Sequence, residues 1–258
     1  MVTMILNGNP VEAQEDKTVL EVARSERIEI PTLCYHEVLG PYGACRLCLV
    51  EAESPELKRS LVASCTLQVC QGLSVKTESV PVQISRGVIF ELLLGRAPDS
   101  TPLIELAAKY GVHSTRFKAD QSEKCIRCGL CIRACRDKIH ASALCFAGRG
   151  QNKRVTAEFG KRSETCIGCG ACVALCPTQA ILQEDVGAER KTFIRENTIS
   201  ILPMVNCRVC GVPFQTRKFM DYLLTNPDLR EGLTVEPGIC PTCSQKYYAE
   251  AMTGEIRF

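Results

Sequence analysis

A run of four cysteines occupies residues 125–135, which read Cys125-Ile126-Arg127-Cys128-Gly129-Leu130-Cys131-Ile132-Arg133-Ala134-Cys135. The same spacing returns in Cys166-Ile167-Gly168-Cys169-Gly170-Ala171-Cys172-Val173-Ala174-Leu175-Cys176-Pro177. Both stretches are repeats of C-x2-C-x2-C-x3-C, a spacing with which thiolates hold a pair of [4Fe–4S] clusters. The sequence therefore predicts two such clusters.

The spacing also predicts how the eight thiolates divide between the two clusters. Three closely spaced cysteines surround one face of a cubane, whereas the fourth is expected to begin a helix that leads away and to ligate the cluster of the other run. One predicted ligand set is Cys125, Cys128, Cys131 and Cys176, and the other is Cys135, Cys166, Cys169 and Cys172.

A third set of cysteines lies near the N-terminus, with one early cysteine, a close pair and a distant fourth. This arrangement suits a [2Fe–2S] cluster, in which two thiolates reach each iron, whereas zinc, the alternative, prefers two paired C-x-x-C loops. The predicted ligands are Cys34, Cys45, Cys48 and Cys65. Around them, Asn7-Gly8 predicts a hairpin, and Thr18 with Glu21 forms a capping-box pattern that opens a helix.

The fourth set lies near the C-terminus and consists of two C-x-x-C loops. Such loops give one ion a tetrahedral sulfur site, for which structural zinc is the first expectation. A mononuclear iron and a further [4Fe–4S] cluster are the alternatives. The predicted ligands are Cys207, Cys210, Cys240 and Cys243. Between the loops, residues 216–225 have the periodicity of a helix with Phe219, Tyr222 and Leu223 on one face.

The composition of the whole chain predicts several small units held together by metal sites. Of 258 residues, 45% are hydrophobic but only 5% are aromatic, and the formal net charge is +2. The charge gives no reason to expect nucleic acid or an anionic membrane surface as a partner. No signal sequence or membrane span is evident, which predicts a cytoplasmic protein with reduced thiols. Cys70 and Cys145 fall outside the four sets and are expected to pack as small hydrophobic residues.

The first set of cysteines carries a resemblance to a known family. The elements Cys34, Cys45-Arg46-Leu47-Cys48 and Ser64-Cys65-Thr66, followed by the paired runs, resemble the N-terminal region of the complex I large iron–sulfur subunit. Iron-only hydrogenases and the small diaphorase subunit of NAD-linked nickel–iron hydrogenases are similar there. The resemblance implies an α+β fold, with a β-grasp [2Fe–2S] ferredoxin domain and a bacterial-type ferredoxin domain with two [4Fe–4S] clusters.

The chain departs from that family between the two ferredoxin domains. Many relatives have a His and three Cys there, which bind another [4Fe–4S] cluster, whereas this chain has no cysteine between Gln71 and Lys124. Residues 82–111 instead have the pattern of two helices, with Thr101 as the expected cap before Pro102. The predicted domains are 1–80 with [2Fe–2S], 81–121 as a helical linker, 122–200 with two [4Fe–4S], and 201–258 as a rubredoxin-like or zinc-ribbon tail.

The chain shows no catalytic constellation of its own. It has no nucleotide-binding glycine motif, and its histidines (His36, His113 and His140) form no triad. Whether it is an enzyme is left open, and an electron-transfer subunit is the preferred interpretation.

The resemblance implies a soluble hetero-oligomer with a flavoprotein subunit that handles NAD(P)H and a second redox or catalytic subunit. That complex would be of the hydrogenase, formate dehydrogenase or electron-bifurcating type. A free polyferredoxin carrier is the alternative.

Overall fold

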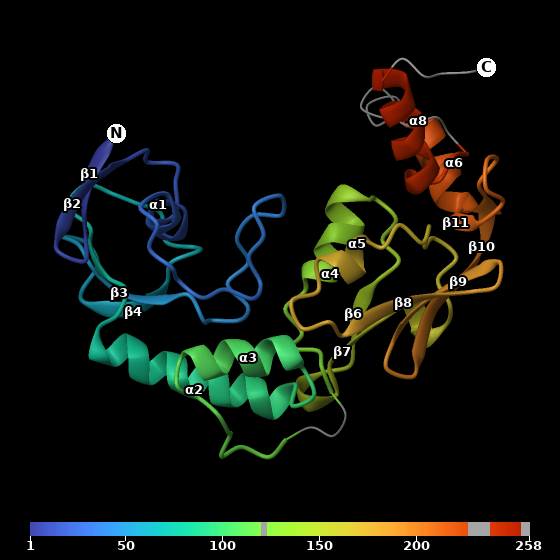
Figure 1. Cartoon of the computed structure of the whole chain (residues 1–258). Coiled ribbons are helices and arrows are strands. Elements are labelled where there is room, and N and C mark those ends of the chain that lie inside the picture. Colours follow the sequence, from blue (N-terminus) through green and yellow to red (C-terminus); the bar gives the residue numbers. More distant parts are fainter. Residues whose placement is uncertain (120–122, 227–237, 254–258) are drawn as a thin grey trace. The chain divides into compact units, whose positions relative to one another are not determined.

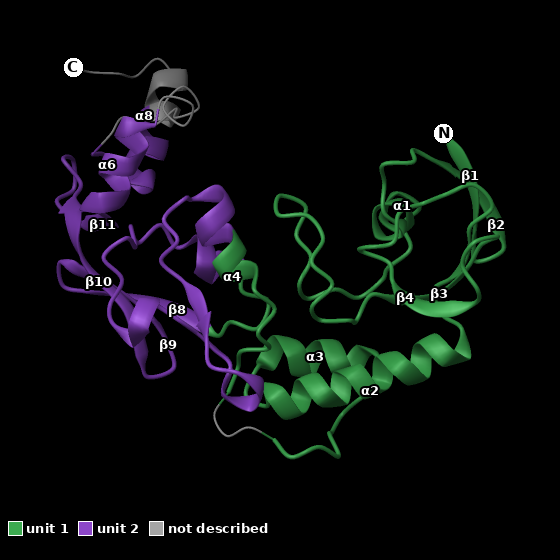
Figure 2. Ribbon diagram, turned by 180° about the vertical axis from the view of Figure 1, so that it is seen from behind, with its two compact units in different colours: residues 1–133, 176–180 green, residues 134–175, 181–258 purple. Residues whose placement is uncertain are grey.

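The computed structural model describes residues 1–119, 123–226 and 238–253, and they fall into two compact units (Figures 1 and 2). The first unit comprises residues 1–133 and 176–180, and the second comprises residues 134–175 and 181–258. The end of the second cysteine run therefore belongs to the first unit, and the end of the first run belongs to the second unit. Each unit is built from both runs.

The first unit opens with a mixed five-stranded sheet. Its strand order is β2-β1-β5-β3-β4, in which β1 and β5 are parallel and the other neighbours are antiparallel. The predicted hairpin at Asn7-Gly8 is confirmed, because both residues have positive φ and Leu6 pairs with Asn9. The strands are β1 (Val2–Leu6), β2 (Asn9–Ala13), β3 (Leu49–Glu53), β4 (Ser60–Ala63) and β5 (Ser74–Lys76).

Helix α1 (Val19–Ser25) packs on this sheet to form its core. The predicted capping box is confirmed: the Thr18 hydroxyl accepts from the Glu21 amide at 3.3 Å, and the Glu21 carboxylate accepts from the Thr18 amide at 2.8 Å. The buried residues of α1 meet alternate residues of β1: Val19, Leu20, Val22 and Ala23 against Val2, Met4 and Leu6. A sheet with a parallel β1–β5 pair and one packed helix agrees with the predicted β-grasp domain.

Two helices follow the sheet, α2 (Val80–Arg96) and α3 (Thr101–Lys109). They lie side by side, and Phe90 stacks on Tyr110 with ring centroids 5.2 Å apart (Figure 1). The predicted cap of α3 is wrong by one residue. Ser100 is the N-cap, since its buried hydroxyl accepts from the Leu103 amide at 3.3 Å, and Thr101 already lies within the helix.

Arg86 joins α2 to the sheet and is only 2% exposed. Its guanidinium donates to the carbonyls of Leu49 and Thr77, each at 3.0 Å, and pairs with Glu78 at 2.7 Å. A buried cation with these partners ties the end of the β-grasp domain to the helical segment.

The second unit contains short helices, a sheet and the C-terminal segment. Its four-stranded antiparallel sheet has the order β11-β10-β9-β8, and β6 pairs with β7. The strands are β6 (Cys145–Ala147), β7 (Arg154–Thr156), β8 (Ile181–Val186), β9 (Glu189–Ile194), β10 (Asn197–Asn206) and β11 (Pro213–Thr216). The longer helices are α6 (Arg217–Thr225), which confirms the predicted helix, and α8 (Pro241–Thr253).

The cysteine runs carry the shorter helical turns. In the first run, α4 (Leu130–Arg133) continues into the π-helical turn η1 (Ala134–Lys138), and the second run contains α5 (Ala171–Ala174). The 3₁₀ turns η2 (Gly150–Asn152) and η3 (Glu158–Gly160) flank β7. Within the described segments, no helix combines the length and the apolar character needed to cross a membrane.

Replacing Arg86 with methionine should destabilise the first unit by about 2–4 kcal/mol, because two buried carbonyls lose their donor. The urea midpoint, followed by far-UV circular dichroism, measures this loss. The matched control is Arg116→Met, since Arg116 is an exposed partner of Glu91 at 3.1 Å and should contribute less than about 1 kcal/mol. Equal midpoints for the two variants would contradict the assigned role of Arg86.

Candidate iron–sulfur and metal centres

The N-terminal cysteines lie together as two pairs. The Cys45 amide donates to the Cys34 sulfur at 3.3 Å, and the sulfur atoms of Cys48 and Cys65 are 3.3 Å apart. All four side chains are buried. A rhombic [2Fe–2S] cluster needs two thiolates on each iron, so the pairs Cys34–Cys45 and Cys48–Cys65 fit its two irons.

The electrostatics favours one thiolate in each pair, since the pKa values of Cys34 and Cys48 are lowered while hydrogen bonding to them and burial raise those of their partners Cys45 and Cys65. Hydrogen bonding from the Cys45 thiol, assisted by the backbone amides of Cys45, Ala44 and Gly43, lowers the pKa of Cys34 to about 6. The Cys65 thiol likewise lowers the pKa of Cys48 to about 6. Gly43 has a φ of +70°, a conformation that glycine adopts freely. Amides directed at the sulfurs stabilise the charged form that binds iron.

The first predicted [4Fe–4S] set belongs entirely to the first unit. Burial, with a smaller contribution from neighbouring charges that include Cys176, raises the pKa values of Cys125 and Cys128 to about 12. Cys131 is buried in α4, and the Cys176 sulfur accepts from the Ala180 amide at 3.2 Å. Buried thiolates are costly without a cation beside them, and iron is the cation that this donor set suits.

The second predicted set belongs entirely to the second unit and surrounds a cavity. The space that no atom fills there is about 400 Å³, part of it open to solvent. The sulfur-bearing residues of its lining are Cys135, Cys166, Cys169 and Cys172. Burial raises the pKa of Cys172 to about 12, and the Ala143 amide donates to the Cys135 sulfur at 3.2 Å. The fourth cysteine of the first run thus lies with the first three of the second run.

The two runs share an unusual backbone. Arg127 and Gly168 occupy equivalent positions and have φ of +59° and +72°, and Gly129 and Gly170 have φ of +80° and +79°. Left-handed residues on either side of the second cysteine let the loop wrap around one face of a cluster. The repeat seen in the sequence is therefore also a repeat of local conformation.

The expectation that the fourth cysteine of each run begins a helix is wrong. Helix α5 ends at Ala174, before Cys176, and Cys135 lies inside η1. The helical turns fill the space between the third and fourth cysteines. These turns carry the fourth cysteine away from the first three of its run. The helical turn contains the fourth cysteine in the first run and precedes it in the second.

The C-terminal cysteines form a compact group. The sulfur atoms of Cys207, Cys210, Cys240 and Cys243 all lie within 4.8 Å of one another. Sulfurs about 2.3 Å from a tetrahedral ion are about 3.8 Å apart, and Cys210 and Cys240 have sulfurs 3.8 Å apart. The group fits one metal ion.

Elements on either side of the group position it. The first loop lies at the end of the β10–β11 hairpin, and Cys243 lies in the first turn of α8. Backbone amides, chiefly those of Cys240 and Cys210, lower the pKa of Cys207 to about 6.

The two remaining cysteines are Cys70 and Cys145, and the prediction that Cys70 packs as a buried residue is wrong. Cys70 is exposed rather than buried, because it lies in the turn before Gly72, whose φ is +75°. Cys145 is half-buried in β6 opposite Thr156.

Sequence reasoning did not identify the residues that hold the cysteine loops. Arg133, Gln183 and Thr216 each donate a hydrogen bond to the backbone of such a loop or of the segment beside it. For Arg133, its position as a charged residue between the ligands Cys131 and Cys135 could have indicated a structural role. Thr216 gives no such indication, because it is far in sequence from the Cys166–Cys169 loop that it contacts.

Two family models match this chain. The model described as a 2Fe-2S iron-sulfur cluster binding domain matches residues 1–80, and the 4Fe-4S dicluster domain matches residues 120–183. Together they account for the first three cysteine sets. Neither match reaches the C-terminal cysteines.

Curated proteins show the same relationship. An NADH-quinone oxidoreductase subunit of Rickettsia prowazekii is 27% identical over 225 residues, covering 78% of this chain and 33% of the relative. The NADH-ubiquinone oxidoreductase 75 kDa subunit of Reclinomonas americana is 28% identical over 226 residues, covering 78% and 32%. This chain thus spans about a third of those relatives.

A solved structure is similar as well. A chain in a crystal structure of an NAD+-reducing [NiFe]-hydrogenase in the H2-reduced state is 30% identical, with a TM-score of 0.54. The match covers 61% of this chain and 75% of that chain.

The fold and the cysteine sets define an iron–sulfur protein with a 2Fe-2S domain followed by a 4Fe-4S dicluster domain. The chain belongs to the same family as the matching chain of the NAD+-reducing [NiFe]-hydrogenase, and it is similar over part of its length to the 75 kDa subunit of NADH-ubiquinone oxidoreductase.

Changing Cys131 to serine should remove one [4Fe–4S] cluster and leave the [2Fe–2S] signal intact, because the hydroxyl is a poor substitute for a buried thiolate. Iron analysis should show a loss of about four irons per chain, and EPR of the reduced protein should show which signal is missing. The control is Cys145→Ser, which should keep its iron. An unchanged iron count in the Cys131 variant would reject the ligand assignment.

Proposed function

We propose that this chain relays electrons through one [2Fe–2S] and two [4Fe–4S] clusters inside a multi-subunit NAD(P)-linked oxidoreductase. The [2Fe–2S] cluster is held by the two N-terminal cysteine pairs, and the [4Fe–4S] clusters by the two crossed sets. The clusters supply one-electron redox chemistry, and the protein fixes their spacing and their surroundings.

The observation that carries this proposal is a hydrophobic cluster shared by two redox sites of the first unit. Cys34 and Cys45 of the [2Fe–2S] set and Cys128 of the first [4Fe–4S] set belong to it. Phe90 of α2 and Leu103 of α3 fill the space around them and are fully buried. Neighbouring redox sites in a dry environment suit direct electron transfer.

A clamp between the same two sites supports the proposal. The Arg133 side chain is 8% exposed and donates to the carbonyls of Leu39, Gly40 at 3.1 Å and Pro41 at 3.5 Å. Its guanidinium lies 4.9 Å from the centroid of the Tyr42 ring. Arg133 thereby attaches the loop that precedes Cys45 to the first cysteine run, and the planar guanidinium is suited to several carbonyls at once.

The proposed partners are a flavoprotein subunit that handles NAD(P)H and a second redox or catalytic subunit. The names of the relatives support them, since these are a quinone oxidoreductase subunit and an NAD+-reducing hydrogenase. We propose that the complex is of the hydrogenase, formate dehydrogenase or electron-bifurcating type. Its proposed location is the cytoplasm.

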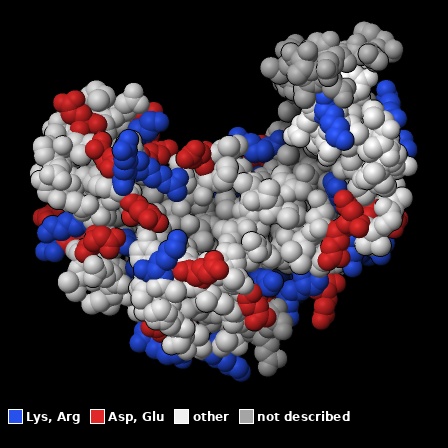
Figure 3. Space-filling view, viewed as in Figure 1, with Lys and Arg blue, Asp and Glu red and all other residues white. Residues whose placement is uncertain are grey.

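Surface character favours a permanent subunit over a free polyferredoxin carrier. On α2, Val80, Ile84 and Leu92 are 67%, 65% and 50% exposed, and three exposed apolar side chains on one helix support an interface with another subunit. Acidic and basic side chains are interspersed over the face in Figure 3, in keeping with the net charge of +2. A free carrier that docks transiently benefits instead from a strong charge of one sign.

The C-terminal set is proposed to hold zinc. Four thiolates in a closed site, with no position left for substrate, are typical of structural zinc.

Metal and sulfide analysis of the anaerobically purified chain tests the cofactors. We expect about ten irons, ten sulfides and one zinc per chain, with EPR signals from one [2Fe–2S] and two [4Fe–4S] clusters. About fourteen irons would make the tail a further cluster, and little iron with several zincs would refute the relay.

The complex is tested with a tagged chain isolated from its own cells. That chain should carry flavin, and NAD(P)H should reduce its clusters, because the proposed flavoprotein partner would remain bound. Isolation as a single chain without flavin would instead support the free carrier.

Replacing Arg133 with methionine should weaken the magnetic coupling between the [2Fe–2S] cluster and the first [4Fe–4S] cluster, because the loop before Cys45 loses its attachment. Spin-relaxation enhancement of the reduced [2Fe–2S] signal measures this coupling. Arg133→Lys keeps the charge but loses the planar guanidinium that reaches several carbonyls. The coupling between the two clusters in this variant should therefore fall between that of the methionine variant and that of the unchanged protein. Coupling unchanged in the methionine variant, with all iron retained, would show that the clamp does not set the spacing.

A further inference from the structure

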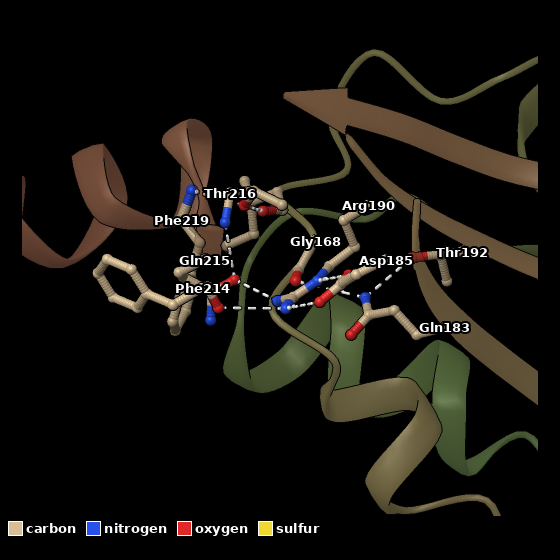
Figure 4. A network of polar contacts seen from close by, with 10 residues as sticks. Gly168, Gln183, Asp185, Arg190, Thr192, Phe214, Gln215, Thr216 and Phe219 are labelled. Atoms are coloured by element: carbon tan, nitrogen blue, oxygen red, sulfur yellow. Dashed lines mark hydrogen bonds and ion pairs between the residues drawn. The ribbon is translucent and has the colours of Figure 1, made fainter. Parts of the chain in front are cut away.

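The first turn of α6 holds the cysteine loop of the second [4Fe–4S] site. Thr216 caps this helix and is 0% exposed, and its hydroxyl accepts from the Phe219 amide at 3.3 Å while it donates to the Ile167 carbonyl (Figure 4). The ammonium of Lys218 donates to the Glu164 carbonyl. The two carbonyls lie on either side of Cys166, so α6 fixes the backbone around a cluster ligand.

The sequence of the two runs differs at the point of this contact. Gly168 occupies the position that Arg127 takes in the first run. A Cβ on Gly168 would lie 2.5 Å from the Thr216 methyl carbon and 3.2 Å from a Leu202 methyl carbon, and the first of these distances is closer than real Cβ atoms approach. Glycine is therefore required where α6 packs, whereas the equivalent position of the first run accommodates arginine.

A second set of contacts joins the same segment to the sheet (Figure 4). Arg190 of β9 pairs with Asp185 at 2.7 and 2.8 Å and donates to the Gln215 side chain at 2.6 Å and to the Phe214 carbonyl at 3.2 Å. Gln215 also accepts from the Thr216 amide at 2.9 Å. Strand β11 is an edge strand of this sheet; Arg190 of β9 holds it there, and Thr216 at its end contacts the cluster loop.

Polar residues that line the cavity also support the cysteine loop. Gln183 of β8 donates to the buried Thr192 hydroxyl at 2.9 Å and to the Gly168 carbonyl at 3.4 Å. The cysteine loop therefore accepts hydrogen bonds from the sheet as well as from α6.

The C-terminal cysteines hold the other end of β11. Among the described residues of this segment, the buried cluster consists of Cys207, Ile239 and Cys240, with Phe214 and Cys243 packed against them. Three of these five are metal ligands, so most of this small core is the metal site itself. A small unit of this composition depends on its metal to fold.

From these contacts we propose that Zn²⁺ in the C-terminal four-cysteine site maintains the second [4Fe–4S] cluster. The ion fixes the end of the β10–β11 hairpin, β11 positions Thr216, and Thr216 holds the Cys166–Cys169 loop around its cluster. This inference rests on the cluster assignments of the proposed function and adds a role for the tail. Loss of the zinc weakens the second cluster and leaves the first unaffected.

Four variants of the full chain test the proposal, with the rate of cluster loss to an iron chelator as the readout. Cys131→Ser and Cys169→Ser provide reference spectra for the two [4Fe–4S] signals. Thr216→Val should release the second cluster roughly three- to tenfold faster, the factor that one lost buried hydrogen bond produces. Cys243→Ser should lose its zinc and behave in the same way.

Two matched variants serve as controls. Thr216→Ser keeps the hydroxyl and should retain the rate of the unchanged protein. Thr225→Val removes a hydroxyl that bonds within α6, to the carbonyls of Asp221 and Tyr222, and should also leave the rate unchanged.

The proposal is overturned if Cys243→Ser has lost its zinc and still releases the second cluster at the unchanged rate. It is also overturned if Thr216→Val loses both cubane clusters equally, since that would indicate general unfolding, or loses neither faster. If Cys243→Ser does not fold, Cys210→Ser, which changes the exposed cysteine of the same set, takes its place under the same criterion. Iron analysis of the unchanged protein comes first, so absence of the cubane clusters would refute the proposed function separately from this inference.

Discussion

The exchange of the fourth cysteine between the two runs is the constraint on which the rest of this structure depends. Cys176 lies in the unit of the first run, and Cys135 lies in the unit of the second. Burial raises the pKa of Cys125 and of Cys172 to about 12, so neither thiolate is stable in its surroundings without a cation. Under the proposed cluster assignment, iron binding and folding are linked, because the bonds that hold the clusters also close each unit.

The segment between the two ferredoxin domains has a structural role. Helices α2 and α3 contribute Phe90 and Leu103 to the hydrophobic cluster that contains cysteines of two redox sites. Arg86 ties α2 to the β-grasp sheet, and Arg133 ties the first run to the loop before Cys45. Packing and buried arginines thereby hold the [2Fe–2S] cysteines next to the first cysteine run.

The C-terminal segment extends the same principle to the second [4Fe–4S] site. The hydrophobic core of its described part is small, and cysteines supply most of it. The hydroxyl of Thr216 is the link to the cluster loop, and the glycine at position 168 makes the close approach possible. In our proposal, the C-terminal metal site influences the second [4Fe–4S] site through these backbone contacts.

The sequence by itself determined the cluster types, the predicted ligand sets, the β-grasp hairpin and the capped helix at Thr18, because these follow from local spacing and local hydrogen bonding. The cap of α3 and the exposure of Cys70 were predicted wrongly, since neighbouring serines and threonines compete as caps and composition does not report burial. Only the tertiary structure decided the pairing of Cys34 with Cys45, the clamp by Arg133 and the contact of Thr216 with Ile167. Each of these joins residues that are separated in the chain, and such contacts depend on how the folded backbone brings distant segments together.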